Sequence, residues 1–305
     1  MSRFAKLAWG TLGWAVLDIL WGAFVRATGS GAGCGNHWPS CNGSVIPTPQ
    51  NVATIIEFTH RILSGVVLVL ILVMLIWGWR KFPRGNPVRL GVTASAAFIL
   101  LEAGLGAGLV LLDLVAANSS ALRAGAVALH LLNTFFLLAC LALTAWWASG
   151  GKRLSLKGQG RLPLLFGIGL AGVALLAMAG AVTALGDTLF PAQTLAQGLA
   201  QDADANASFL VRLRVIHPLI AILVSGYTLG LVRYLSGRTR DAAVRRLSLV
   251  LGGLVLVQLA AGVINVLLLA PTWMQIIHLL LADAVWISYV LLAAAVLPER
   301  ALGKM

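Results

Sequence analysis

The chain has 305 residues, of which 59% are hydrophobic and only 10% are charged, and its formal net charge is +12. This composition excludes an ordinary soluble domain, because the apolar runs are longer than a soluble core requires. The positive charge does not indicate nucleic acid binding, since most basic residues are confined to the tails and to loops between apolar segments. We therefore expect no nucleic acid partner and a chain that lies in a lipid bilayer.

Eight segments are apolar and long enough to cross a bilayer, for which about 20 residues are needed. In chain order they are 8–28, 53–79, 90–112, 121–147, 164–186, 210–234, 247–269 and 273–296. Each is expected to be a helix, because an open strand would leave its backbone groups unpaired in lipid. The sequence thus predicts an all-α integral membrane protein with eight transmembrane helices.

Basic residues mark one side of this topology. Most of the 22 Lys and Arg lie in the N-terminal tail, in three connecting loops and in the C-terminal tail. All of these fall on the same side of an eight-helix chain, which the positive-inside rule makes cytoplasmic. Both termini are therefore expected in the cytoplasm. The first apolar stretch lacks a cleavage site and no transit segment precedes it, so we expect a retained helix in a prokaryotic plasma membrane.

The two halves of the chain carry matching motifs at matching places in their helices. The matches are Gly22-Ala-Phe-Val25 with Gly180-Ala-Val182, Glu102-Ala-Gly104-Leu-Gly106 with Gln258-Leu-Ala-Ala-Gly262, His60 with His217, and His130 with His278. Each half holds four segments, so both halves have the same orientation, as in a parallel repeat. We predict two pseudo-twofold-related four-helix bundles, at 1–148 and 164–305, joined by a basic cytoplasmic linker at 149–163.

Four histidines sit one apiece on four of the predicted helices. They are His60, His130, His217 and His278, each about six to ten residues from the outer end, or roughly 9–15 Å deep. Bundle interiors hold cofactors on facing helices, and a haem iron takes axial imidazoles from opposite sides. The pattern predicts one haem per bundle. Ordinary hydrogen-bonded packing is the alternative, whereas zinc or copper would recruit more ligands at one point.

Charged residues near these histidines distinguish the two halves. Arg61 adjoins His60 and Arg214 lies three residues before His217, and both are predicted propionate contacts, with interfacial anchoring as the alternative. Glu57 lies one turn from His60, at the position that Arg214 occupies before His217. We predict chemistry in the first half, with Glu57 as the catalytic group that accepts or relays protons, and a fixed cofactor in the second. The alternative for Glu57 is a salt bridge to an arginine.

The outer loop after the first helix contains Cys34 and Cys41, on the oxidising side of the membrane. A disulfide is expected between them, either as a structural clip or as an exchangeable redox pair. Cys140 lies within an apolar segment and is expected to be inert. His37 is expected to be a surface residue of this loop, with a metal or propionate contact as the alternative, and Asp187, Asp202 and Asp204 in the long outer loop of the second half are expected to be merely solvated.

These motifs together resemble the haem A synthase family. The resemblance rests on Gly29-Ser30-Gly31-x-Gly33-Cys34-x-x-x-Trp38-Pro39-x-Cys41, on Glu57-x-x-His60-Arg61, and on single histidines at 130, 217 and 278. It covers nearly the whole chain and implies conversion of haem O to haem A, by oxidation of a porphyrin methyl to a formyl group. It also implies a substrate haem O site in the N-terminal bundle and a haem b cofactor in the C-terminal one. The implied partners are a haem O synthase, haem-copper oxidase assembly and an electron acceptor that the motifs do not identify.

The chain departs from the family in one place. Many members have a second cysteine pair in the outer loop of the C-terminal half, and residues 187–209 contain none. That weakens any mechanism that passes electrons between two disulfides. Two other functions remain open: a dihaem electron carrier of the cytochrome b type, and a haem transporter or chaperone. The first usually has ligands near both membrane faces, and the second does not require a carboxylate in one half only.

Overall fold

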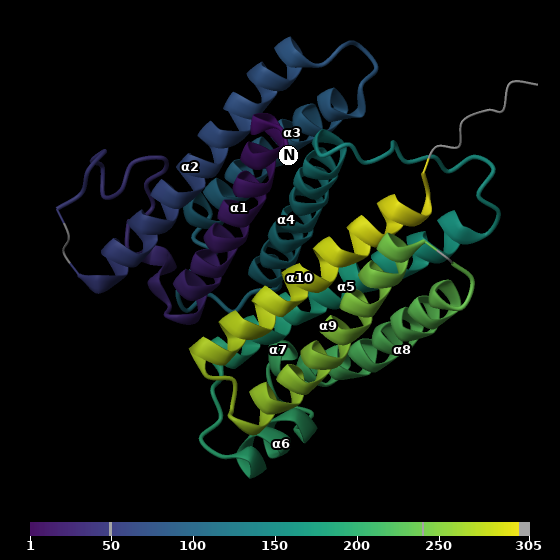
Figure 1. Ribbon diagram of the computed structural model, residues 1–305. Helices are drawn as coiled ribbons and strands as arrows, with labels where there is room; N and C mark the ends of the chain where they lie inside the picture. The colour runs from purple at the N-terminus through teal and green to yellow at the C-terminus, as the bar shows by residue number, and fades with distance from the viewer. Residues whose placement is uncertain (49–50, 240, 299–305) are drawn as a thin grey trace, which may run out of the picture.

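The computed structural model describes residues 1–48, 51–239 and 241–298, and it is almost entirely helical (Figure 1). The helices in chain order are α1 (Arg3–Ala27), η1 (Ser30–Ala32), α2 (Val52–Lys81), α3 (Pro87–Leu111), α4 (Ala121–Ala148), α5 (Leu162–Leu189), α6 (Leu195–Ala203), α7 (Phe209–Arg212), η2 (Leu213–Val215), α8 (Ile216–Ser236), α9 (Ala242–Leu267) and α10 (Thr272–Val296). Eight spans among the described residues are long and apolar enough to cross a membrane, with α7, η2 and α8 forming one of them. The prediction of an all-α membrane protein with eight spans is confirmed.

Local sequence signals account for where the long helices begin and end. The side chains of Asn51, Asn86 and Ser120 cap α2, α3 and α4 by accepting hydrogen bonds from backbone N–H groups of the first turn. Arg80 and Lys81 lie in the last turn of α2, where the helix dipole favours positive charge. The predicted bounds agree with those of α2, α3 and α4 to within three residues.

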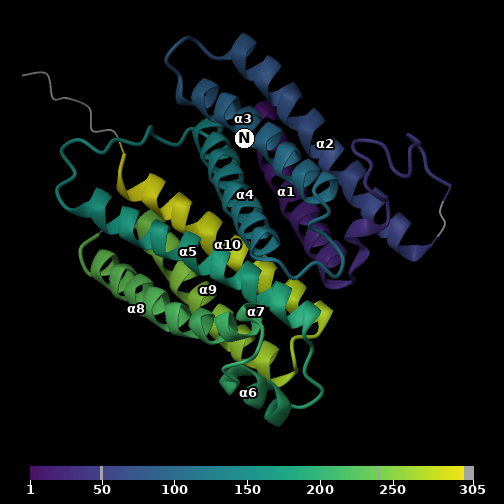
Figure 2. The same cartoon turned by 180° about the vertical axis from the view of Figure 1, so that it is seen from behind.

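The helices of each half form a closed ring of neighbours. In the first half, α1 packs against α2 and α4, and α3 packs against the same two helices. In the second half, α5 and α9 each pack against α8 and α10. The view from behind shows the same two groups (Figure 2). The histidine-bearing helices, α2 with α4 and α8 with α10, therefore lie diagonally across each ring.

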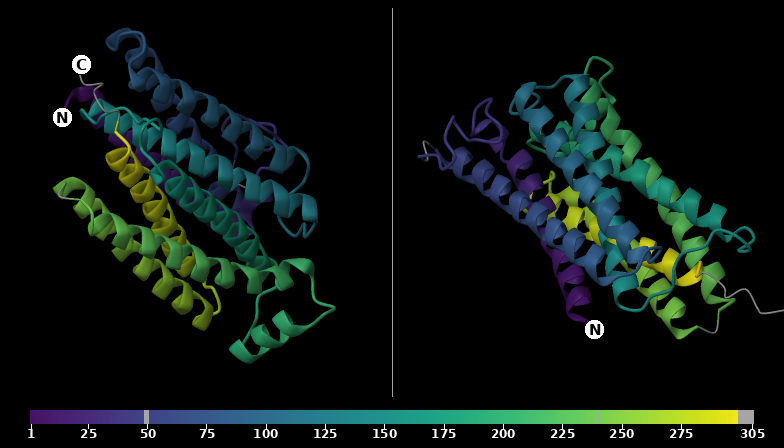
Figure 3. Two further views of the ribbon diagram at one scale, coloured as in Figure 1. Left: turned by 90° about the vertical axis from the view of Figure 1, so that its right-hand side faces the viewer. Right: turned by 90° about the horizontal axis from the view of Figure 1, so that it is seen from above.

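The two halves share one apolar core. The contact is made by α1 and α4 on one side and by α5 and α10 on the other (Figure 3). Phe135 of α4 stacks on Trp286 of α10 with ring centroids 4.9 Å apart, and Trp286 Nε1 donates to the backbone oxygen of Phe135 at 2.6 Å. Near the histidine-bearing ends, Arg26 of α1 donates to Ala184 O at 2.7 Å and to Gln275 Oε1 at 2.8 Å. The two halves are therefore joined both in the apolar core and near the histidine-bearing ends of the helices.

Three features of the linker and the second half were not predicted from the sequence. The segment expected as one helix at 210–234 changes to a 3-10 turn, η2, just before His217. A short helix, α6, lies in the outer loop. The 149–163 linker pairs with the end of α10, where Gln159 Nε2 donates to Pro298 O at 2.8 Å. The predicted C-terminal tail, residues 299–305, lies outside the described residues.

Candidate functional site

The four histidines lie in equivalent positions near the same ends of α2, α4, α8 and α10, and all are partly buried. The structure brings His217 and His278 together, with ring centroids 6.4 Å apart and an angle of 77° between the rings. A metal bound at about 2.0–2.1 Å from an imidazole nitrogen on each side, as for zinc, separates the ring centres by about 6 Å. The spacing of this pair therefore fits one iron atom between two axial imidazoles.

A glycine of the neighbouring helix lies against each histidine ring. The pairs are Gly22 with His60, Gly106 with His130, Gly180 with His217, and Gly262 with His278. A Cβ atom added at Gly22 or Gly180 would lie 2.9 Å from Cε1 of the imidazole, and one at Gly262 would lie 3.3 Å away. These glycines, on α1, α5 and α9, are needed because a side chain would displace the ring.

Two acidic residues that the sequence did not identify as site residues contact the histidines of the first half. Asp18 Oδ1 on α1 lies 3.0 Å from His60 Nδ1, and Glu102 Oε1 on α3 lies 3.3 Å from His130 Nδ1. Glu102 was visible only as part of the repeated motif, and Asp18 had no signal of its own. The two acids share one feature in the sequence, which could have identified them: each lies four residues before the glycine that packs against its histidine.

Glu57 is buried beside the outer loop. Its Oε1 lies 2.5 Å from Arg61 Nη2, and its Oε2 accepts a hydrogen bond from Cys34 N at 2.8 Å. The salt bridge considered as the alternative is therefore present. Arg61 also donates to the backbone oxygens of His37, at 2.7 Å, and Ser40, at 2.6 Å. Both side chains bind the loop, and a propionate contact for Arg61 stays a prediction.

The loop after α1 is held on one face of α2. A disulfide joins Cys34 and Cys41 within it, as expected. Thr54, one turn before Glu57, donates through its hydroxyl to Gly33 O at 2.7 Å. Because residues three and seven positions after Thr54 lie on the same helix face, Thr54, Glu57 and Arg61 form one row of loop contacts. The loop is thereby fixed one helical turn from His60.

Arg214 is engaged in the second half by residues that were expected to be merely solvated. Its Nε lies 3.1 Å from Asp187 Oδ1, its Nη1 lies 3.9 Å from Asp202 Oδ1, and its Nη2 donates to Phe190 O at 2.7 Å. The expectation for these two aspartates was wrong, whereas Asp204 is exposed. Burial raises the pKa of Asp202, and the nearby Arg214 opposes that rise. A propionate contact for Arg214 stays a prediction.

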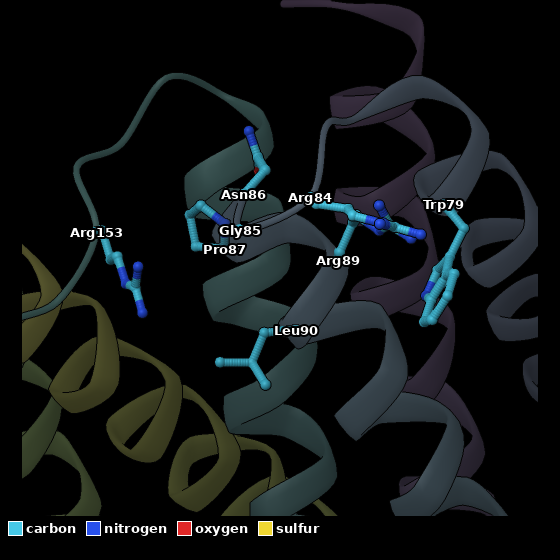
Figure 4. A pocket seen from close by; sticks show the side chains of 8 residues that line it. All are labelled: Trp79, Arg84, Gly85, Asn86, Pro87, Arg89, Leu90 and Arg153. Carbon is cyan, nitrogen blue, oxygen red and sulfur yellow. The ribbon is translucent and has the colours of Figure 1, made fainter.

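The opposite, basic end of the molecule has a hollow of a different kind. Figure 4 shows Arg84, Arg89 and Arg153 around it, with Trp79 beside Arg89. The Arg89 guanidinium lies 4.3 Å from the centroid of the Trp79 ring, a cation–π distance. None of the residues that line this hollow is a histidine or a carboxylate. It is separate from the histidine sites.

Known proteins are similar to this chain in sequence. Residues 5–290 match the family COX15-CtaA, described as cytochrome oxidase assembly protein. The chain is 51% identical over 301 residues to a protein of Thermus thermophilus named protoheme IX farnesyltransferase, covering 98% of this chain and 49% of that one. It is 44% identical over 96 residues to a heme A synthase of Lysinibacillus sphaericus, covering 32% of this chain and 31% of that one. The chain thus spans about half the length of the first of these relatives, and by the extent of the family match it belongs to the COX15-CtaA family.

Proposed function

We propose that this chain is a haem A synthase, which converts haem O to haem A by oxidising a porphyrin methyl to a formyl group. The observation that carries the proposal is that one histidine lies on each of four helices, with His217 and His278 brought together in the second half and Glu57 holding the outer loop beside His60 in the first. Family membership and the similarity to proteins named heme A synthase support it. A dihaem electron carrier or a haem transporter has no need for a buried carboxylate beside one site alone.

The C-terminal bundle is proposed to hold a resident haem b between His217 and His278. The 6.4 Å separation of the two rings supports this, as does the space that Gly180 and Gly262 leave for them. When bound, the haem would supply electron-transfer chemistry. The protein residues around the site orient the two imidazoles, and Gly180 and Gly262 carry no side chain that would displace the rings.

The N-terminal bundle is proposed to bind the substrate haem O through His60 and His130. Oxidation of a methyl group releases protons, so a proton-accepting group is needed near the substrate. Glu57 is the proposed acceptor, because a carboxylate with two bound partners still has free lone pairs. Its salt bridge to Arg61 and its contact with Cys34 N hold it in place and keep the loop against α2, one turn from His60.

The proposed topology places the histidine ends of the helices at the outer membrane face and both termini in the cytoplasm of a prokaryotic cell. The basic loops at the other end support this orientation. The pseudo-twofold relation of residues 1–148 and 164–305 is supported by equivalent glycine–histidine contacts in both halves. The farnesyltransferase name of the longer relatives supports a haem O synthase as the partner that supplies substrate, with haem-copper oxidases receiving the product.

Conversion of haem O in cells tests the proposal. The chain is expressed with a haem O synthase in bacteria that make no haem A, and the extracted haems are separated by chromatography. Haem A is expected with the wild-type chain and not with the His60→Ala variant. Accumulation of haem O without haem A, in cells where the wild-type chain is folded in the membrane, would contradict the proposed activity.

A further inference from the structure

Both histidines of the first half belong to the same three-part arrangement. His60 Nδ1 contacts Asp18, and the Ser64 hydroxyl, four residues after His60, lies 3.0 Å from the same Asp18 oxygen. His130 Nδ1 contacts Glu102, and the Thr134 hydroxyl, four residues after His130, donates to the same Glu102 oxygen. Each histidine therefore has a carboxylate from the preceding helix and a hydroxyl from its own helix.

These carboxylates are the acceptors within reach of the histidine Nδ1 atoms. Among the described residues, neither Nδ1 makes a hydrogen bond of full geometry, and each lies at ion-pair distance from its carboxylate, 3.0 Å for His60 and 3.3 Å for His130. The carboxylates are also held in place by the hydroxyls, and Asn133 Nδ2 donates to the second oxygen of Glu102. Both are largely shielded, with side-chain exposures of 13% for Asp18 and 19% for Glu102. A shielded acceptor beside an imidazole exerts more influence than an exposed one, because water screens it less.

The second half lacks every part of this arrangement at the equivalent positions. Four residues before the glycines that contact the rings are Leu176 and Gln258, and four residues after the histidines are Ala221 and Ala282. Gln258 does contact His278, but through its Nε2 atom, 3.2 Å from His278 Nε2. The two haem sites of the proposed enzyme thus differ in what surrounds their ligands, while the ligands themselves are the same.

We propose that Asp18 and Glu102 are positioning residues that make His60 and His130 stronger iron ligands than His217 and His278. The inference rests on the proposed function, because it assumes that these histidines bind haem. A carboxylate beside the outer nitrogen of a metal-bound histidine fixes the tautomer and ring orientation and raises the basicity of the ligand. More basic ligands stabilise oxidised iron, so the haem of the N-terminal bundle has the lower reduction potential.

The arrangement also gives a functional reason for the difference between Glu102 and Gln258. Glutamate and glutamine have nearly the same shape and occupy equivalent places in the repeat, with Glu102 beside His130 Nδ1 and Gln258 beside His278 Nε2. They differ in that the carboxylate only accepts hydrogen bonds, whereas the amide also donates. This change of residue type, together with the missing counterparts of Asp18 and of the two hydroxyls, therefore distinguishes a substrate site that favours ferric iron from a cofactor site that does not.

The test is a redox titration of the purified protein with both haems bound, followed by absorbance. The variants are Asp18→Asn and Glu102→Gln, which keep size and remove the charge, and the reverse variant Gln258→Glu. The first two are expected to raise the potential of the N-terminal haem, with haem binding at that site weakened by about 10–100-fold. The Gln258→Glu variant is expected to lower the potential of the C-terminal haem alone.

The outcomes separate this inference from the proposed function. Unchanged potentials in all three variants, with both haems retained, would overturn the inference and leave the haem sites intact. If Asp18→Asn and Glu102→Gln lose the N-terminal haem, Gln258→Glu decides, since a lowered potential supports the inference and an unchanged one overturns it. A wild-type protein that binds no haem would contradict the proposed function itself.

Discussion

Replacing Glu57 by glutamine separates a catalytic role of this residue from its role in holding the loop. The amide oxygen can accept from either Cys34 N or Arg61, but its NH₂ group then faces the other donor, so one of two hydrogen bonds is lost. A hydrogen bond to a charged group contributes about 1.5–3 kcal/mol, and we expect that loss in stability. General acid–base catalysis contributes about 10²–10⁴-fold, so haem A formation should fall by that factor.

Thr54→Val is the matched control, because it removes the hydroxyl that donates to Gly33 O and loosens the same loop without altering the carboxylate. Haem extracts and thermal unfolding are compared for both variants, with a haem O synthase present. Glu57→Gln should stop the reaction at haem O or a partly oxidised product while haem b stays bound. Equal loss of haem A in Thr54→Val would assign the effect to the loop, and wild-type activity in Glu57→Gln would refute the reasoning.

Three further predictions concern packing and the loop. Gly22→Ala should weaken haem binding in the N-terminal bundle, because the added Cβ would lie too close to the His60 ring. Gly13→Ala is the control, since no atom lies within 4 Å of its added Cβ. Equal haem absorbance spectra in the two variants would count against the close contact. Arg214→Met should lower the unfolding temperature in detergent by an amount equivalent to about 1.5–3 kcal/mol, and the exposed Arg212→Met should leave it unchanged. Cys34→Ser removes the disulfide, so it should lower the free energy of unfolding by about 2–4 kcal/mol and increase proteolysis of the outer loop. Unaltered cleavage would show that the disulfide does not stabilise the loop.

The eight spans and the position of the histidines along them could be predicted because both follow from one-dimensional patterns. A long apolar run must be a helix in lipid, and a residue's distance from the end of that run sets its depth. The 3-10 turn before His217 could not be predicted in this way, since three residues are too few for a period of about 3.0 rather than 3.6 residues to show in the sequence. Only the bounds of α8 differ as a result.

The carboxylates beside His60 and His130 could not be predicted because they depend on how neighbouring helices are rotated. Asp18 reaches His60 from a helix more than 40 residues earlier in the chain, and no periodicity within either helix fixes that contact. The same holds for Asp187 and Arg214, which lie at facing ends of α5 and η2. The sequence identified the histidines proposed to bind haem, and helix packing decides which acidic residues lie beside them.

The central claim is that the four histidines form two haem sites of different kinds. Its most direct test is the type and amount of haem in purified wild-type, His60→Ala and His217→Ala proteins, made in cells with a haem O synthase. The account predicts that His217→Ala lacks haem b, whereas His60→Ala keeps haem b and lacks bound haem O and haem A. Loss of the same haem in both variants, or retention of haem b in His217→Ala, would contradict it.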